Sequence, residues 1–134
     1  AATMAGKRQE DILRFYEDFR QHAGWKSLEA MRVFLPRLFR ERDLSELEFL
    51  TSHATLCISR FPYPDCLEQP GLFLNCTAKD RLHLELQVPI DREPVARTLK
   101  ETVNCPIDLG LQEFDRLYAK FVAAHKERPS GGDG

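Results

Sequence analysis

The chain begins with a helical pattern of apolar residues. From residue 7 to residue 23 apolar side chains recur in steps of three and four, which places them on one side of a helix. This stripe consists of Ile12, Phe15, Tyr16, Phe19 and Ala23. A second helical stripe follows the predicted N-cap Ser27 and continues to about Arg42. Because Pro36 lacks an amide hydrogen, we expect a kink or break there, and we expect a short helix over 44–50.

The pattern then changes from helical spacing to strict alternation. Three strands are expected, over 55–61, 72–77 and 81–88. The last of them is the clearest, because Leu and Val alternate there with Arg, His, Glu and Gln. A long loop over 62–71 separates the first two strands, and its prolines cannot donate to a strand ladder.

The hydrophobic pattern also predicts the register of the hairpin formed by the last two strands. A three-residue loop over 78–80 pairs Leu74 with Leu84 and Asn75 with His83, so that each face is uniform. The same register predicts four further pairs of partners. They are Cys76 with Leu82, Leu72 with Leu86, Phe73 with Glu85, and Thr77 with Arg81. A shift by one residue would mix apolar and polar partners on both faces.

Two helices are expected after the third strand. Pro89 is predicted to end that strand, and Asp91 to cap a helix that carries Val95, Leu99 and Val103. A last helix is predicted from Asp108. Its apolar stripe consists of Leu111, Phe114, Leu117, Tyr118, Phe121, Val122 and His125. The predicted fold class is α+β: N-terminal helices, a three-stranded antiparallel meander and two C-terminal helices, with the helices packed on one sheet face.

Length and composition predict one domain. The chain has 134 residues, of which 43% are hydrophobic and 30% charged, as is typical of a globular protein. We expect a single domain over 7–128. Residues 1–6 are expected to be a flexible or expression-derived N-terminus, and residues 129–134 a flexible tail. The net charge of -2 argues against nucleic-acid binding by bulk charge, and no apolar run is long enough to span a membrane.

The cysteines and histidines do not form a recognisable metal motif. The candidate donors are His53, Cys57, Cys66, Cys76, His83 and Cys105. No two cysteines have the Cys-x-x-Cys spacing that is typical of zinc sites, so we predict neither a metal nor a cofactor. With few cysteines and no secretory signal pattern, the sequence indicates reduced thiols and a cytoplasmic location.

The polar face of the predicted sheet is the first candidate for function. Aromatic and arginine side chains, which are enriched in protein interfaces, are interspersed with its polar residues. The predicted partner-binding residues are Phe61, Tyr63, Phe73, Asn75, Arg81, His83 and Glu85, together with the 62–71 loop. No catalytic motif is present. We therefore interpret the chain as a non-catalytic interaction module of adaptor, inhibitor, immunity or chaperone type, whose partner is another protein or a second copy.

Two alternatives remain open at the level of sequence. A small enzyme would use His83 and Glu85 as an acid/base pair, with Cys66 as a possible nucleophile. A nucleic-acid-binding protein would use the basic segment over 26–42. Its candidate residues are Arg32, Arg37, Arg40 and Arg42.

Overall fold

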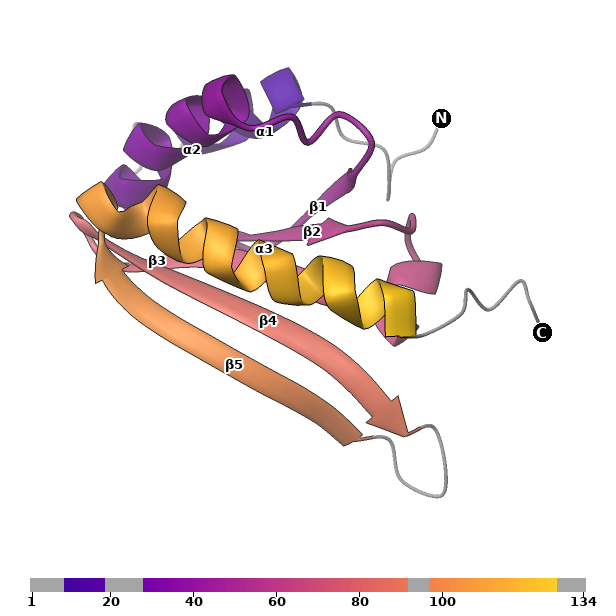
Figure 1. The fold of residues 1–134 in the computed structure, drawn as a ribbon. Helices are drawn as coiled ribbons and strands as arrows, with labels where there is room; N and C mark the ends of the chain where they lie inside the picture. The colour runs from indigo at the N-terminus through magenta and orange to yellow at the C-terminus, as the bar shows by residue number, and fades with distance from the viewer. Residues whose placement is uncertain (1–8, 19–27, 92–96, 128–134) are drawn as a thin grey trace.

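Three α-helices and five strands make up the fold in the part of the chain that the structure describes (Figure 1). The structure is a computed structural model, and it describes residues 9–18, 28–91 and 97–127. In chain order the helices and strands are α1 (Gln9–Asp18), α2 (Glu29–Glu41), β1 (Glu48–Ser52), β2 (Thr55–Ser59), β3 (Gly71–Ala78), β4 (Arg81–Asp91), β5 (Arg97–Pro106) and α3 (Gly110–Glu127). Two short 3₁₀ turns complete the described part, η3 (Asp65–Glu68) and η4 (Ile107–Leu109).

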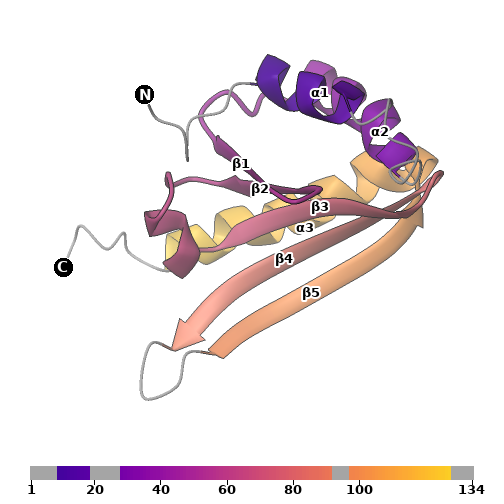
Figure 2. The same cartoon turned by 180° about the vertical axis from the view of Figure 1, so that it is seen from behind.

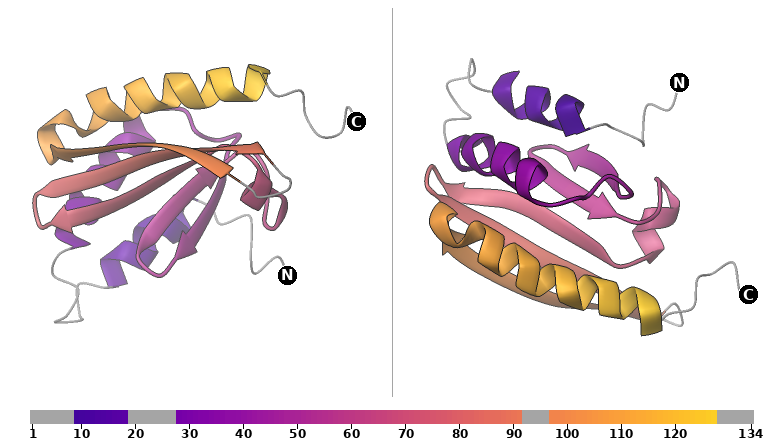
Figure 3. Two further views of the ribbon diagram at one scale, coloured as in Figure 1. Left: turned by 90° about the horizontal axis from the view of Figure 1, so that it is seen from below. Right: turned by 45° about the horizontal axis from the view of Figure 1, so that its top comes forward.

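The strands form one antiparallel sheet in the order β1-β2-β3-β4-β5, so every strand pairs with its neighbour in the chain. The three helices lie on the same side of this sheet, with α2 between α1 and α3 (Figure 3). In the view from behind, β3 and β4 lie in front of α3, and no described helix covers the sheet (Figure 2). We call this uncovered side the open face. The predicted α+β class and the one-sided helix layer are confirmed in outline.

The core lies between the helices and the inner side of the sheet. Each helix turns its apolar stripe inward, as shown by the fully buried Tyr16 of α1, Phe34 of α2 and Phe121 of α3. The strands contribute every second residue, since side chains alternate between the two faces of a sheet. The buried apolar side chains of the strands are Phe49, Leu56, Ile58, Leu72, Leu74, Leu82, Leu84, Leu86 and Cys105. This alternation assigns the other half of each strand to the open face.

The predicted register of β3 and β4 is confirmed from Leu72 to Cys76. Leu74 pairs with Leu84 and Asn75 with His83, as the uniform faces require. The register departs from the prediction only at the turn, where Ala78 pairs with Arg81 because a bulge follows Cys76.

Two predicted helices, over 44–50 and 91–103, are wrong, because residues 48–50 of the first belong to β1 and residues 97–103 of the second belong to β5. In the second segment, Leu99 and Val103 are four residues apart, which fits one face of a helix. An even spacing fits one face of a strand equally well. The β-branched Thr98 and Thr102 favour the strand, and β4 is available as its partner. In the residues that the structure describes, the sheet therefore has five strands instead of three, and one α-helix follows it instead of two.

The predicted break at Pro36 and the predicted strand end at Pro89 are both wrong. Helix α2 continues through Pro36, and its buried residues Leu35 and Leu38 pack into the core on both sides of the proline. Strand β4 continues past Pro89 to Asp91. At Pro89 this strand pairs with β5 only, because its pairing with β3 ends at Gln87, and prolines are tolerated at such edges.

Some predictions fall on residues outside the described part of the chain. These are the terminal segments over 1–6 and 129–134, the helical positions Phe19 and Ala23, the N-cap Ser27 and Val95. Among the described helices, none is long and apolar enough to cross a membrane.

Candidate functional site

The open face carries rows of neighbouring side chains from successive strands. One row crosses the sheet from Cys57 through Phe73 and Glu85 to Thr102. The next row contains Asn75, His83 and Asn104. The polar and aromatic face predicted from the sequence is therefore assembled from four strands.

A hollow of about 450 Å³ lies where the loop after β2 meets the open face. Its sheet side is formed by residues of β1, β2, β3, β4 and β5, and its loop side by η3 and its flanks. The lining residues are Leu50, Thr51, Ser52, Cys57, Tyr63, Cys66, Leu67, Gln69, Phe73, Gln87, Pro89 and Thr98. We call this space the open-face hollow. None of these described lining residues carries a formal charge at neutral pH.

Backbone hydrogen bonds shape the loop that borders the open-face hollow. The amide of Cys66 donates to the carbonyl of Pro62 at 3.0 Å, and the amide of Leu67 donates to that of Pro64 at 3.0 Å. The amide of Gln69 then donates to the carbonyl of Cys66 at 3.2 Å. These bonds form the 3₁₀ turn η3, which leaves the side chain of Leu67 66% exposed at the border of the hollow.

The predicted partner-binding residues fall into three groups. Tyr63 and Phe73 line the open-face hollow together. Asn75, His83 and Glu85 lie on the same face beside it, in the two rows described above, and do not line it.

Two predicted residues lie apart from the hollow. Arg81 is on the open face but six residues along β4 from Gln87, a distance of ~20 Å along an extended strand. Phe61 packs against α3, where its ring centre is 5.9 Å from that of His125. The structure therefore does not bring all seven predicted residues to one place.

Sequence reasoning did not assign Leu50 to the site, and it included Leu67 only as an unnamed member of the 62–71 loop. Leu50 was missed because its segment was predicted to be helical, whereas it lies on the open face of β1. Leu67 is an apolar residue in a proline-rich loop without helical or strand periodicity. An apolar residue that belongs to no predicted helix or strand is a sequence signal for a binding surface, and this signal could have identified Leu67.

His83 and Glu85 form a polar chain on the open face. The Nε2 atom of His83 lies 3.5 Å from Oε1 of Glu85, and its Nδ1 atom lies 2.9 Å from Oδ1 of Asn104. The side-chain nitrogen Nε2 of Gln87 donates a hydrogen bond to Oε2, the other carboxylate oxygen of Glu85. Neighbouring side chains on the sheet thus hold His83 and Glu85 in place. Of the residues in this hydrogen-bonded series, Gln87 alone lines the open-face hollow.

The two thiols of the open-face hollow are not activated nucleophiles. Burial raises the pKa of Cys57 to about 12, with the nearby thiolate of Cys66 adding to the effect. Burial also raises the pKa of Cys66. A catalytic cysteine is activated by the opposite shift, which makes the thiolate, its reactive form, abundant at neutral pH.

The arginines of the basic segment are engaged with carboxylates. Arg42 donates two hydrogen bonds to Asp115, from Nε at 2.8 Å and from Nη2 at 2.7 Å, and this contact lowers the pKa of Asp115. The other ion pairs are Arg32 with Glu29 and Glu17, Arg37 with Glu41, and Arg40 with Glu41. Their carboxylates offset the positive charge that the sequence places over 26–42.

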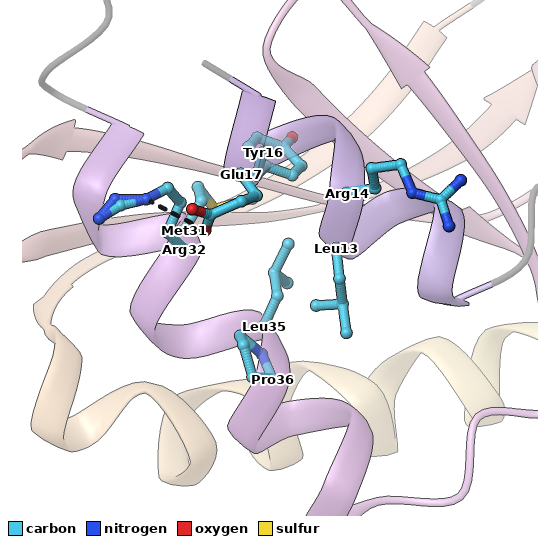
Figure 4. A pocket seen from close by; sticks show the side chains of 8 residues that line it. All are labelled: Leu13, Arg14, Tyr16, Glu17, Met31, Arg32, Leu35 and Pro36. Carbon is cyan, nitrogen blue, oxygen red and sulfur yellow. Dashed lines mark ion pairs between the residues drawn. The ribbon is translucent and has the colours of Figure 1, made fainter. Parts of the chain in front are cut away.

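A second hollow, of about 310 Å³, lies between α1 and α2 (Figure 4). The side chains of Leu13 and Leu35 point into it, and Pro36 borders it. Arg32 is also part of its lining, and the Nε atom of this arginine lies 3.9 Å from Oε1 of Glu17. This hollow is therefore an apolar gap between two helices, with an ion pair along one side.

No metal centre is found in the described part of the chain, where no three His, Cys, Asp or Glu side chains are placed to hold an ion. No family model, curated protein or solved structure matches this sequence or fold. The function of the chain is therefore inferred from the geometry of the open face.

Proposed function

We propose that the protein binds a protein partner through its open face and the 62–71 loop, with an apolar side chain of the partner entering the open-face hollow. The observation that carries this proposal is the uncharged lining of that hollow, set within a sheet face of charged and polar side chains. Its volume of about 450 Å³ is large enough to accept a buried side chain.

The composition of this surface supports a protein as the partner. Interface centres are poor in charge and rich in aromatic residues, and their rims are polar. Tyr63 and Phe73 supply the aromatic side chains, and the exposed Leu67 lies at the border of the hollow. Glu85 and Lys100, on the strands beside it, supply a charged rim.

The two alternative functions have less support from the same geometry. For an enzyme, His83 and Glu85 lie outside the lining of the hollow, and the pKa of Cys66 is raised by burial. For nucleic-acid binding, the candidate arginines form ion pairs with carboxylates of α1, α2 and α3. Protein binding uses the features of the open face without either of these difficulties.

The test compares two exposed apolar residues on opposite sides of the molecule. Leu67→Glu introduces a charge at the border of the open-face hollow, and Val33→Glu introduces the same charge on α2. Because both side chains are exposed, at 66% and 49%, both variants should fold. Their folding is checked by thermal unfolding followed by circular dichroism.

Affinity capture from cells in which the protein naturally occurs provides the measurement. We expect the wild-type chain and Val33→Glu to recover the same partner, and Leu67→Glu to recover at least about tenfold less, since a charge in an interface centre is costly. Equal recovery by Leu67→Glu would overturn the proposal, as would the absence of any reproducible partner. If the partner is a second copy, light scattering should give a dimer mass for the wild type and a monomer mass for Leu67→Glu.

A further inference from the structure

Two cysteines from different elements line the open-face hollow. Cys57 belongs to β2, in the sheet, and Cys66 belongs to η3, in the loop. Both are free thiols, and both are only partly buried. The two residues face the same space from the sheet and from the loop, and the charge of a Cys66 thiolate adds to the burial that raises the pKa of Cys57.

The other two cysteines have different surroundings. Cys76 is on the opposite side of β3 from Phe73, facing the helices, and its sulfur accepts hydrogen bonds from the first turn of α2. Cys105 is buried in the core and is 3% exposed. Cys57 and Cys66 both line the open-face hollow, whereas Cys76 and Cys105 do not.

We propose that Cys57 and Cys66 form a redox dithiol site, which a small disulfide such as oxidised glutathione converts reversibly into an intramolecular disulfide. This disulfide joins β2 to η3 across the open-face hollow. The inference goes beyond partner binding and holds whether or not a partner docks there.

The reaction proceeds by two thiol–disulfide exchanges. The thiolate of Cys66 attacks one sulfur of oxidised glutathione, forms a mixed disulfide and releases one glutathione thiolate. The thiolate of Cys57 then attacks the Cys66 sulfur and releases the second glutathione thiolate. The two protein thiols lose two electrons and two protons, and one glutathione disulfide is reduced to two glutathione thiols.

The environment of the two thiols sets the order of these steps and their dependence on pH. Cys66 reacts first because it lies in the loop. The attack by Cys57 is the slower step, because the raised pKa of Cys57 makes its thiolate scarce at neutral pH. Both steps become faster as the pH rises, because each requires a thiolate. Once formed, the bond opens slowly, because a thiol of high pKa is a poor leaving group.

The experiment treats the full chain with oxidised glutathione at about pH 8.5, near the ordinary pKa of a cysteine. The reaction is stopped with acid, the remaining thiols are alkylated, and the digested chain is analysed by mass spectrometry. We expect a Cys57–Cys66 linkage at least about tenfold more abundant than any linkage of Cys76 or Cys105.

Two variants show whether the pair reacts as proposed. Cys57→Ser lacks the resolving thiol, so glutathione should stay attached to Cys66 as a mixed disulfide. In Cys66→Ser, Cys57 should stay reduced, because the attacking thiol is gone. The proposal is wrong if the wild-type chain stops at glutathionylated Cys66, or if its main linkage involves Cys76 or Cys105. Equal glutathionylation of Cys66 in the wild type and Cys57→Ser would lead to the same conclusion.

Discussion

The hydroxyl of Tyr16 donates a hydrogen bond of 2.7 Å to the carbonyl oxygen of Ala54. This bond joins α1 to the turn between β1 and β2, across 38 residues of sequence. The tyrosine side chain is 1% exposed, and burial raises its pKa. It fixes the first helix to the edge hairpin of the sheet, whose strand β1 contributes to the open-face hollow.

Tyr16→Phe should lower the free energy of unfolding by about 1–3 kcal/mol. The ring still fills its place in the core, but the carbonyl of Ala54 loses its buried donor. Chemical denaturation measures the loss, with Tyr63→Phe as the control, because Tyr63 is 38% exposed. Equal stability of Tyr16→Phe and the wild type would show that this bond does not hold α1 in place.

Gly110→Ala should destabilise the protein by about 1–3 kcal/mol through overpacking. A Cβ atom at Gly110 would lie 2.5 Å from Cε1 of Phe34 and 2.7 Å from Cδ1 of Leu82, at the start of α3. Denaturation of Gly110→Ala, Phe34→Leu and the double variant measures this conflict. The double variant should be more stable than the sum of the single effects predicts, because the smaller side chain leaves room for the methyl group. Simple additivity would count against the close approach.

Glu101 should make the stability of the protein sensitive to acid. Hydrogen bonds from Lys120 at 2.8 Å and Arg116 at 2.6 Å lower the pKa of its carboxyl. A lowered pKa in the folded state adds stability above the unfolded value of about 4.3, and this gain is lost as the pH falls through the folded value.

Glu101→Gln should therefore cost less than about 1 kcal/mol at neutral pH, as is usual for an exposed pair, and the difference from the wild type should shrink at low pH. Urea denaturation at a series of pH values measures it, with Glu46→Gln in an exposed turn as the control. If the difference in unfolding free energy between Glu101→Gln and the wild type stays constant from neutral to acidic pH, the pKa of Glu101 is not lowered in the folded protein.

The fold is partly encoded in local patterns and partly in pairing between distant segments. The register of β3 and β4 was predictable because only one pairing gives Leu72, Leu74 and Leu84 a common face. Strand β5 was not predictable in this way, because the spacing of Leu99 and Val103 fits a helix and a strand equally well. Its conformation is decided by the partner strand β4, which a local pattern does not reveal.

The candidate site shows the same division. The alternation of β3 and β4 assigned Phe73, Asn75, His83 and Glu85 to one face correctly. The fold of the 62–71 loop against β1 and β3, which brings Leu67 near Leu50 and Phe73, depends on contacts that no periodicity records. The alternation of residues along a strand thus predicts which side chains share a sheet face. The position of a hollow in that face can be found only from the tertiary structure.

The most direct test of partner binding through the open face is photo-crosslinking from single positions of the intact chain. A benzophenone amino acid replaces Leu67 in one variant and Val33 in another, and the cells are irradiated before purification. Because the two positions lie on opposite sides of the molecule, the proposed interface predicts a covalent adduct to one protein from position 67 and none to that protein from position 33. Adducts to the same protein from both positions in equal yield, or no adduct from position 67, would contradict it.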